Sequence, residues 1–111
     1  MEVKYVKSGS GLKLNIYIDG NLWRVVKTSY FERKMKVLVK SKDFKEAFKK
    51  FEKQKVIEIS LILLDKRSYL KKEWEDKMRL KLFSEGDINE VLEEILTPFF
   101  HEEEEVKSRL D

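Results

Sequence analysis

The sequence predicts an α+β fold: a small antiparallel three-stranded sheet followed by a helical region. Three observations predict it. Apolar residues alternate with polar ones at period two in the first part of the chain, which is typical of half-buried strands. Asp19-Gly20 separates two of these runs and favours a type I′ hairpin turn, because both residues accept positive φ. From Thr28 the apolar residues recur at helical spacing instead.

A β-meander is predicted over residues 1–28, from the alternating runs EVKYV, LKLNIYI and LWRVV. The Asp19-Gly20 turn and a four-residue loop at residues 8–11 predict its register. The expected pairs are Ile18 with Asn21, Ile16 with Trp23, Leu14 with Val25, Tyr5 with Leu14 and Val3 with Ile16. This register places apolar residues on one face. Because three short strands are too few to be stable alone, we expect helices to cover that face.

A basic linker and helix are predicted over residues 29–55. The first part, SYFERKMKVL, is compatible with a short helix or with irregular structure. The second part, SKDFKEAFKKFEKQ, is predicted to be an amphipathic helix capped by Ser41. Its apolar stripe, at i, i+3, i+4 and i+7, consists of Phe44, Ala47, Phe48 and Phe51.

Three further helices are predicted over residues 56–96. The first has the sequence VIEISLILLDKR and is expected to bury Ile57, Leu61 and Leu64. The second repeats apolar residues at i+4, namely Leu70, Trp74 and Met78. The third begins at a capping box, Ser84-Glu85-Gly86-Asp87, and is expected to bury Ile88, Val91, Leu92 and Ile95.

An acidic terminal helix is predicted over residues 97–111. Thr97 and Pro98 fit the N-cap and the first helical position. The glutamates at 102–105 would lie near the positive end of this helix, and Lys107 and Arg109 near its negative end.

Composition bounds the class of protein. The 111 residues contain no cysteine, which excludes disulfides and thiol chemistry and favours the cytoplasm. No apolar run reaches membrane-spanning length, and the first residues lack the apolar core of a signal peptide, so no membrane partner is expected. Lys and Glu are abundant while Gln54 is the only glutamine, which resembles the composition of thermophile proteins.

No enzymatic chemistry is expected. His101 is the only histidine, and without cysteine or a spaced partner it predicts neither a metal site nor nucleophilic catalysis. Successive glutamates at 102–105 point around a helix axis instead of converging on a cation. Phosphate-loop, dinucleotide-binding and serine-hydrolase motifs do not occur. We therefore assign no catalytic residue, no cofactor and no metal.

Charge is divided between the two halves of the chain. Residues 1–55 contain 15 Lys and Arg against 6 Asp and Glu, a net charge of +9, and residues 56–111 contain 9 against 15, a net charge of −6. The basic residues that we expect to bind an acidic protein or nucleic acid are Lys45, Lys49, Lys53, Arg67, Lys71, Lys72, Lys77, Arg79 and Lys81. Acidic residues such as Glu73 interrupt them, so a solvated surface held by i,i+4 pairs stays an alternative.

Residues 60–96 resemble the three-helix repeat of the RecX family, the bacterial regulators of the recombinase RecA. The family pattern is A-L-x-x-L-x-x-R, then E-L-x-x-K-L, a K-G-F/Y turn and I-x-x-V-L/I-x-x-L. The residues that match, in order and without a gap, are Ser60, Leu61, Leu64, Arg67, Glu73, Trp74, Lys77, Met78, Phe83, Ile88, Val91, Leu92 and Leu96. The segment LNIYIDGNLWRVV is similar to the N-terminal strand pair of the same family.

Two positions depart from the family pattern, and the length differs as well. Leu70 stands where the family usually has a helix-capping Ser or Thr. Leu82 stands where it has the turn glycine. RecX proteins generally carry three such repeats, whereas this sequence accommodates one, at residues 56–96.

The resemblance implies a non-enzymatic regulator in the cytoplasm that acts in DNA recombination, DNA repair and the SOS response. Its partner would be the RecA filament on single-stranded DNA, which it would inhibit, and the pattern leaves open whether the DNA is contacted directly. Two alternatives stay open. One is a RecA-independent nucleic-acid-binding module, and the other is a self-associating structural domain whose basic and acidic halves meet in a homo-oligomer.

Overall fold

The computed structural model describes the backbone of residues 1–96 and the side chains of residues 1–94. The predicted terminal helix at 97–111, with His101, lies outside the described residues. A three-stranded antiparallel sheet is followed by four α-helices, which confirms the α+β class. The chain divides into two compact units, unit 1 (Met1–Phe51) and unit 2 (Glu52–Asp111).

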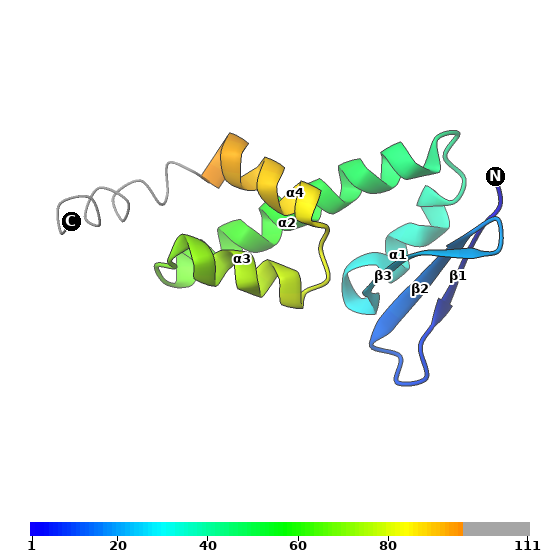
Figure 1. Ribbon diagram of the computed structural model, residues 1–111, viewed down its shortest axis with the longest axis horizontal. Helices are drawn as coiled ribbons and strands as arrows, with labels where there is room; N and C mark the ends of the chain where they lie inside the picture. Colours follow the sequence, from blue (N-terminus) through cyan, green and yellow to red (C-terminus); the bar gives the residue numbers. More distant parts are fainter. Residues whose placement is uncertain (97–111) are drawn as a thin grey trace. The chain divides into compact units, whose positions relative to one another are not determined.

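The sheet of unit 1 is a meander of β1 (Val3–Lys7), β2 (Lys13–Ile18) and β3 (Asn21–Lys27), hydrogen-bonded in the order β1-β2-β3 (Figure 1). Asp19 and Gly20 have φ values of 49° and 83°, as the predicted hairpin turn requires. The Asp19 carboxylate also accepts a hydrogen bond of 2.8 Å from the Glu2 N–H. The turn therefore holds the start of β1 against the end of β2.

The predicted register of β1 is wrong by two residues. Tyr5 pairs with Ile16, and Val3 pairs with Ile18. The physical reason is the loop between the strands: the Ser8 N–H donates to the Lys13 carbonyl at 2.8 Å, so the loop closes further along the chain than predicted. An even shift leaves each side chain on its predicted face.

The predicted register of β3 is wrong by one residue beyond the first pairs. Ile18 pairs with Asn21 as predicted, but a bulge leaves Trp23 without an opposite residue, and Leu14 then pairs with Val26. Val26 is therefore fully buried, whereas Val25 is only half-buried. Alternation alone cannot reveal such a bulge when apolar residues stand on both sides of it.

Helices and an aromatic cluster cover the dry face of the sheet. Helix α1 (Thr28–Leu38) packs on β2 and β3 and buries Phe31 and Met35. The rings of Phe31 and Phe48 stack with centroids 4.9 Å apart, and the Trp23 ring meets Phe48 edge-on at 5.0 Å. Such pairs add to the hydrophobic stabilisation of the buried area.

Helix α2 (Phe44–Lys66) is continuous over 23 residues, which corrects the expectation of two helices with a break near residue 55. No glycine or proline interrupts this segment. The capping residue lies two positions later than predicted. The Asp43 carboxylate, not Ser41, accepts a hydrogen bond from the Glu46 N–H at 3.2 Å. The predicted stripe is present, because Phe44 and Phe48 are buried.

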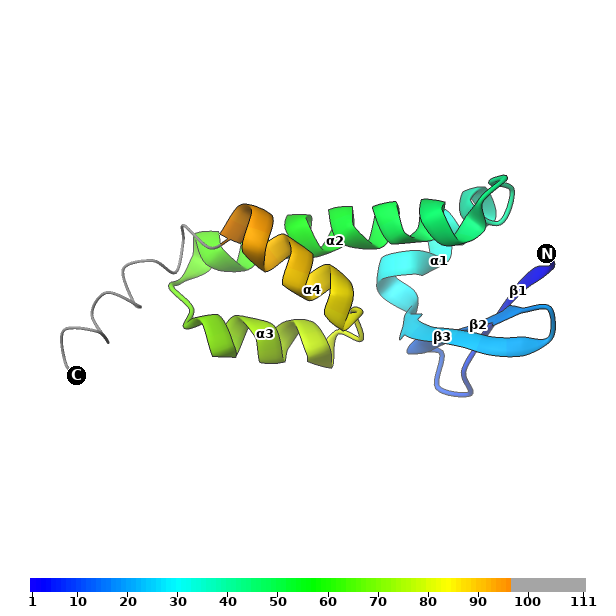
Figure 2. The same cartoon turned by 45° about the horizontal axis from the view of Figure 1, so that its top comes forward.

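Unit 2 combines the second part of α2 with α3 (Lys71–Leu80), α4 (Glu85–Val91) and a short π-helix (Leu92–Leu96), as both views show (Figures 1 and 2). Its buried apolar residues include Val56, Trp74, Met78, Ile88 and Val91. Over residues 1–96 no helix has the length and apolar character that crossing a membrane requires.

The face of α2 that is buried in unit 2 differs from the predicted one. Leu61 is 46% exposed, and Ile57 and Leu64 are only half-buried. The buried positions are Val56 and Ser60, one residue earlier. The prediction followed hydrophobicity, whereas the structure places a serine at the centre of the interface.

Candidate partner-binding surface

A buried hydroxyl organises the interior of unit 2 and so positions α3. The Ser60 hydroxyl donates to the Val56 carbonyl at 2.6 Å, one turn back on α2. It accepts a hydrogen bond from the Trp74 indole N–H at 2.8 Å. Both side chains are fully buried, so this bond satisfies the one polar group of the tryptophan and fixes α3 on α2.

A buried carboxyl pair lies where α4 begins. Glu52 on α2 and Asp87 on α4 are each 1% exposed. The Ser84 hydroxyl accepts from the Asp87 N–H at 3.2 Å, which is the predicted N-cap. The reciprocal half of the predicted capping box is wrong, because Glu52, not Asp87, accepts from the Ser84 N–H at 3.2 Å.

The Asp87 carboxyl is free to turn inward because Glu52 has taken its place in the cap. No donor among the described residues reaches either of its oxygens. The pKa of Asp87 is raised to about 7, first by burial and next by the neighbouring Glu52 carboxyl. Near neutral pH, one proton can therefore be shared between the Asp87 and Glu52 carboxyls and join them by a hydrogen bond.

Two of the predicted binding residues instead hold unit 2 together. Lys53 lies 2.7 Å from a Glu94 carboxylate oxygen and 3.6 Å from Glu90, so it joins α2 to the last helical segment. The hydrogen bond to Glu94 is the main reason that the pKa of Lys53 is raised.

Arg79 is the second of these residues, and it forms ion pairs with three carboxylates. It contacts Glu85 at 2.6 Å, Asp76 at 3.1 Å and Glu75 at 3.2 Å. The bond to Glu85 is the largest cause of its raised pKa. This guanidinium ties the end of α3 to the first turn of α4, so it has little capacity for an external anion.

Four other predicted residues lie on α3 or in the loop directly before it, and we name them the α3 basic cluster: Arg67, Lys71, Lys72 and Lys77. The Arg67 guanidinium lies 4.0 Å from the centroid of the Tyr69 ring, and the Lys77 ammonium lies 5.8 Å from the same centroid. Tyr69 is buried, so its ring is a fixed platform for both cations.

Electrostatics reinforce this platform. Hydrogen bonding to Tyr69 is the main cause that raises the pKa of Arg67, and the 3.0 Å pair with Glu73 is the next. The same bond to Arg67 lowers the pKa of the Tyr69 hydroxyl. Glu73 accepts from the Leu70 N–H, which is the first cause of its lowered pKa, and so it caps α3 while it orients Arg67.

Lys71 and Lys72 stand in the first turn of α3, where the helix dipole disfavours positive charge. Both are exposed, and neither forms an ion pair with another residue in the described part of the chain. Helix stability therefore does not explain their position. An external anionic partner would gain from both charges at once.

The remaining candidates lie apart from this cluster. Lys45 and Lys49 are exposed on the first turns of α2 in unit 1, and Lys49 takes part in a further interaction there. Lys81 follows α3 directly, is half-buried and also has a partner. Of the nine predicted residues, the structure thus brings Arg67 and Lys77 together over one ring, with Lys71 and Lys72 in the first turn of the same helix.

No family model, curated protein or solved structure matches this chain. Within residues 1–96, no three His, Cys, Asp or Glu side chains are grouped so that they could hold a metal ion. The site must therefore be judged by its own geometry. That geometry is a set of cations, two of which, Arg67 and Lys77, are held on the buried Tyr69 ring.

Three residues of structural consequence were missed by sequence reasoning: Glu52, Ser60 and Asp87. Glu52 had a detectable signal, since it stands four residues after Phe48 and four before Val56, on the buried stripe of α2. Ser60 continues the same spacing. A polar residue in a helical apolar stripe is thus the signal to examine.

Proposed function

We propose that this chain is a RecX-like, non-enzymatic regulator that binds the RecA filament on single-stranded DNA and restrains its activity in the cytoplasm. The observation that carries the proposal is the α3 basic cluster. Its cations are fixed on the Tyr69 ring or placed at a helix end that disfavours them. Acidic protein surface or DNA phosphate in the filament would supply the opposite charge.

Two backbone features support the family resemblance. Leu82 has a φ of 64°, the left-handed conformation that glycine adopts most readily, and the RecX pattern has glycine there. Leu70 is the N-cap of α3, and the pattern has Ser or Thr there. The two departures in sequence therefore occupy the conformations for which the family residues are suited.

The test is ATP hydrolysis by preformed RecA filaments on single-stranded DNA, with this protein added. We expect hydrolysis to slow with increasing protein. The Lys71→Glu/Lys72→Glu variant should need roughly tenfold more protein for the same inhibition, because it reverses two charges at the proposed contact. Lys4→Glu/Lys36→Glu makes the same charge change on exposed residues of unit 1 and should inhibit like the wild type.

An unchanged rate with the wild-type protein would contradict the proposed function. Equal inhibition by the wild type and Lys71→Glu/Lys72→Glu would leave a RecA regulator whose binding surface lies elsewhere. Circular dichroism of both variants checks that the substitutions, all at exposed positions, leave the fold intact.

Exposed apolar side chains favour a second candidate, self-association. Leu61 and Ile62 are adjacent on α2 and both exposed in the described structure. Sedimentation across protein concentration tests it: a dimer that Leu61→Lys/Ile62→Lys abolishes would support this function, and a monomer at all concentrations would reject it.

A further inference from the structure

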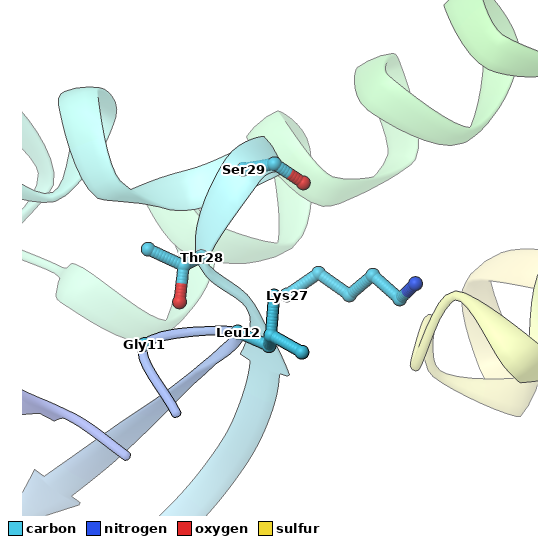
Figure 3. Close-up of a pocket in the computed structure, with 5 residues that line it drawn as sticks. All are labelled: Gly11, Leu12, Lys27, Thr28 and Ser29. Carbon is cyan, nitrogen blue, oxygen red and sulfur yellow. The ribbon is translucent and has the colours of Figure 1, made fainter. Parts of the chain in front are cut away.

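A small hollow opens at the N-terminal end of α1, and it is lined by Gly11, Leu12, Lys27, Thr28 and Ser29 (Figure 3). Its volume is about 320 Å³. The Gly11–Leu12 turn, which has a positive φ of 76° at Gly11, forms one wall, and the first turn of α1 forms the other. All five residues belong to unit 1.

The start of α1 lacks the groups that normally satisfy a helix N-terminus. Its N-cap is Lys27, whose side chain makes no capping hydrogen bond, and no acidic residue stands in the first turn. The Thr28 N–H donates to the Leu12 carbonyl at 3.1 Å. The next N–H, that of Ser29, has no acceptor among the described residues. An unneutralised positive helix end results.

A buried hydroxyl independently indicates that a ligand is missing from this place. Thr28 is only 8% exposed, and its hydroxyl has no hydrogen-bond partner among the described residues. Figure 3 shows this hydroxyl pointing toward the Gly11–Leu12 turn, into the hollow. Since a buried polar group without a partner destabilises the folded state, an acceptor atom entering here would relieve that penalty.

Two lysines add positive charge at the same end of the sheet. Lys13 and Lys27 are directly opposite each other in the β2–β3 register. Like charges at opposed positions destabilise a sheet. Neither lysine forms an ion pair with another described residue, and the nearest acid on α1, Glu32, is engaged by Lys7 at 2.7 Å. The repulsion is thus not relieved within this part of the chain.

We propose that the N-terminal end of α1 and the Gly11–Leu12 turn form a binding site for a phosphate-class oxyanion. The Thr28 hydroxyl and the Ser29 N–H donate to its oxygens, and Lys27 and Lys13 balance its charge. The same chemistry is offered by free phosphate and by a nucleic-acid backbone. This site does not depend on the proposed regulation of RecA, which uses residues of unit 2.

The first arm of the test uses nuclear magnetic resonance of the full chain labelled with ¹⁵N. Sodium phosphate is titrated at constant pH and at an ionic strength held constant with sodium chloride. We expect saturable shifts of the Leu12, Thr28 and Ser29 amide signals and an unchanged signal of the exposed Lys36. Shifts that do not saturate, or that follow exposed lysines over the whole surface, would overturn the proposal.

Two variants with a matched control sharpen this result. Thr28→Val removes the hydroxyl at nearly constant shape, and it should weaken phosphate binding at least threefold while raising the melting temperature. A purely structural role for the hydroxyl predicts a lower melting temperature and unchanged binding. Lys27→Gln should weaken binding at least threefold, whereas Lys36→Gln, on an exposed lysine of α1, should not. If Thr28→Val fails to fold, Lys27→Gln decides, and unchanged phosphate affinity in it overturns the site.

The second arm identifies the source of the phosphate. A short oligothymidylate replaces phosphate in the titration, and phosphate is then added as competitor. Shifts at Leu12, Thr28 and Ser29 that phosphate reverses assign the site to a nucleic-acid backbone. Shifts elsewhere, with phosphate still bound at Thr28, assign it to free phosphate or a mononucleotide. Neither outcome alters the inhibition expected of the α3 basic cluster, so failure here and failure of the proposed function are distinguishable.

Discussion

The interiors of the two units differ in polarity: that of unit 1 is mainly aromatic, and that of unit 2 includes polar and acidic side chains. Unit 1 covers its sheet with rings: Phe31, Phe44 and Phe48 are buried, and Trp23 packs on the last two. Unit 2 places Glu52, Ser60 and Asp87 in its interior. An apolar interior loses stability mainly through cavities, whereas a polar one loses it through unpaired groups and through titration. Unit 1 should therefore be sensitive to loss of side-chain volume, and unit 2 to pH and to loss of a hydrogen-bond partner.

The largest effect is expected from Phe48→Ala in unit 1. This ring contacts Trp23, Phe31 and Phe44, so its removal leaves a cavity at the centre of the cluster. The free energy of unfolding of unit 1 should fall by about 3–5 kcal/mol. Hydrogen exchange of the sheet amides measures it. Leu61→Ala, at an exposed position, is the control, and a loss below about 1 kcal/mol for Phe48→Ala would contradict the aromatic core.

The next effect concerns pH and unit 2. The pKa of Asp87 is raised to about 7, above the ordinary value of 3.8, so the folded state binds this proton more tightly than the unfolded chain does. The stability due to this proton is full at low pH and is lost as pH rises through about 7. We expect unit 2 to be about 2 kcal/mol less stable at pH 8 than at pH 5.

The groups around the pair set the direction of this effect. Glu90 adds a repulsive charge, while Lys53 is engaged by Glu90 and Glu94. Asp87→Asn should remove most of the pH dependence, because the amide donates to Glu52 without titrating. The stability of unit 2 at each pH is measured by urea unfolding followed by Trp74 fluorescence. Trp23→Phe is included in every variant so that Trp74 is the one fluorescent tryptophan. Asp65→Asn, on an exposed residue, is the control, and equal pH dependence in both variants would reject the shared proton.

Ser60→Ala tests the polar interior without involving charge. The Trp74 N–H would lose its acceptor, and a buried donor would remain unpaired. We expect unit 2 to lose about 1–2 kcal/mol and the Trp74 fluorescence to change, with unit 1 unaffected in hydrogen exchange. Ser68→Ala, on an exposed serine of the loop before α3, serves as the control. Full stability of Ser60→Ala would show that the hydroxyl is dispensable.

The smallest effect should be a gain. Leu82 holds a φ of 64°, which strains a residue with a side chain and costs glycine almost nothing. Leu82→Gly is therefore expected to stabilise unit 2 by about 0.5–1 kcal/mol, the strain being offset in part by lost side-chain contacts. Leu80→Gly, at the 76% exposed end of α3, should instead destabilise, and the difference in melting temperature measures both. A loss of stability on Leu82→Gly would show that its side-chain contacts outweigh the strain.

Local chemistry explains which parts of the fold the sequence could predict. Asp19-Gly20 specified its turn because few residue pairs accept positive φ twice, and Phe44 and Phe48 specified their stripe by spacing. The bulge at Trp23 and the inward face at Ser60 depend on partners distant in sequence. No local pattern encodes those partners, so hydrophobicity alone selected Leu61 and Val25 instead.

The candidate site was less predictable than the fold, for a related reason. A lysine or arginine in a sequence shows charge but not which acid it meets. Arg79 and Lys53 were grouped with Lys71 and Lys72, yet three carboxylates surround the first and two hold the second. Only the folded arrangement separates cations that stabilise the unit from cations available to a partner.

The bulge in β3 also affects how this chain should be aligned with any other hairpin. Because Trp23 is an added residue, the parity of side chains reverses from Arg24 onward. An alignment that counts evenly across the Asp19-Gly20 turn would assign Val25 to the interior and Thr28 to the wrong side. A one-residue gap at Trp23 restores the equivalence of faces when this strand is aligned with one that lacks the bulge.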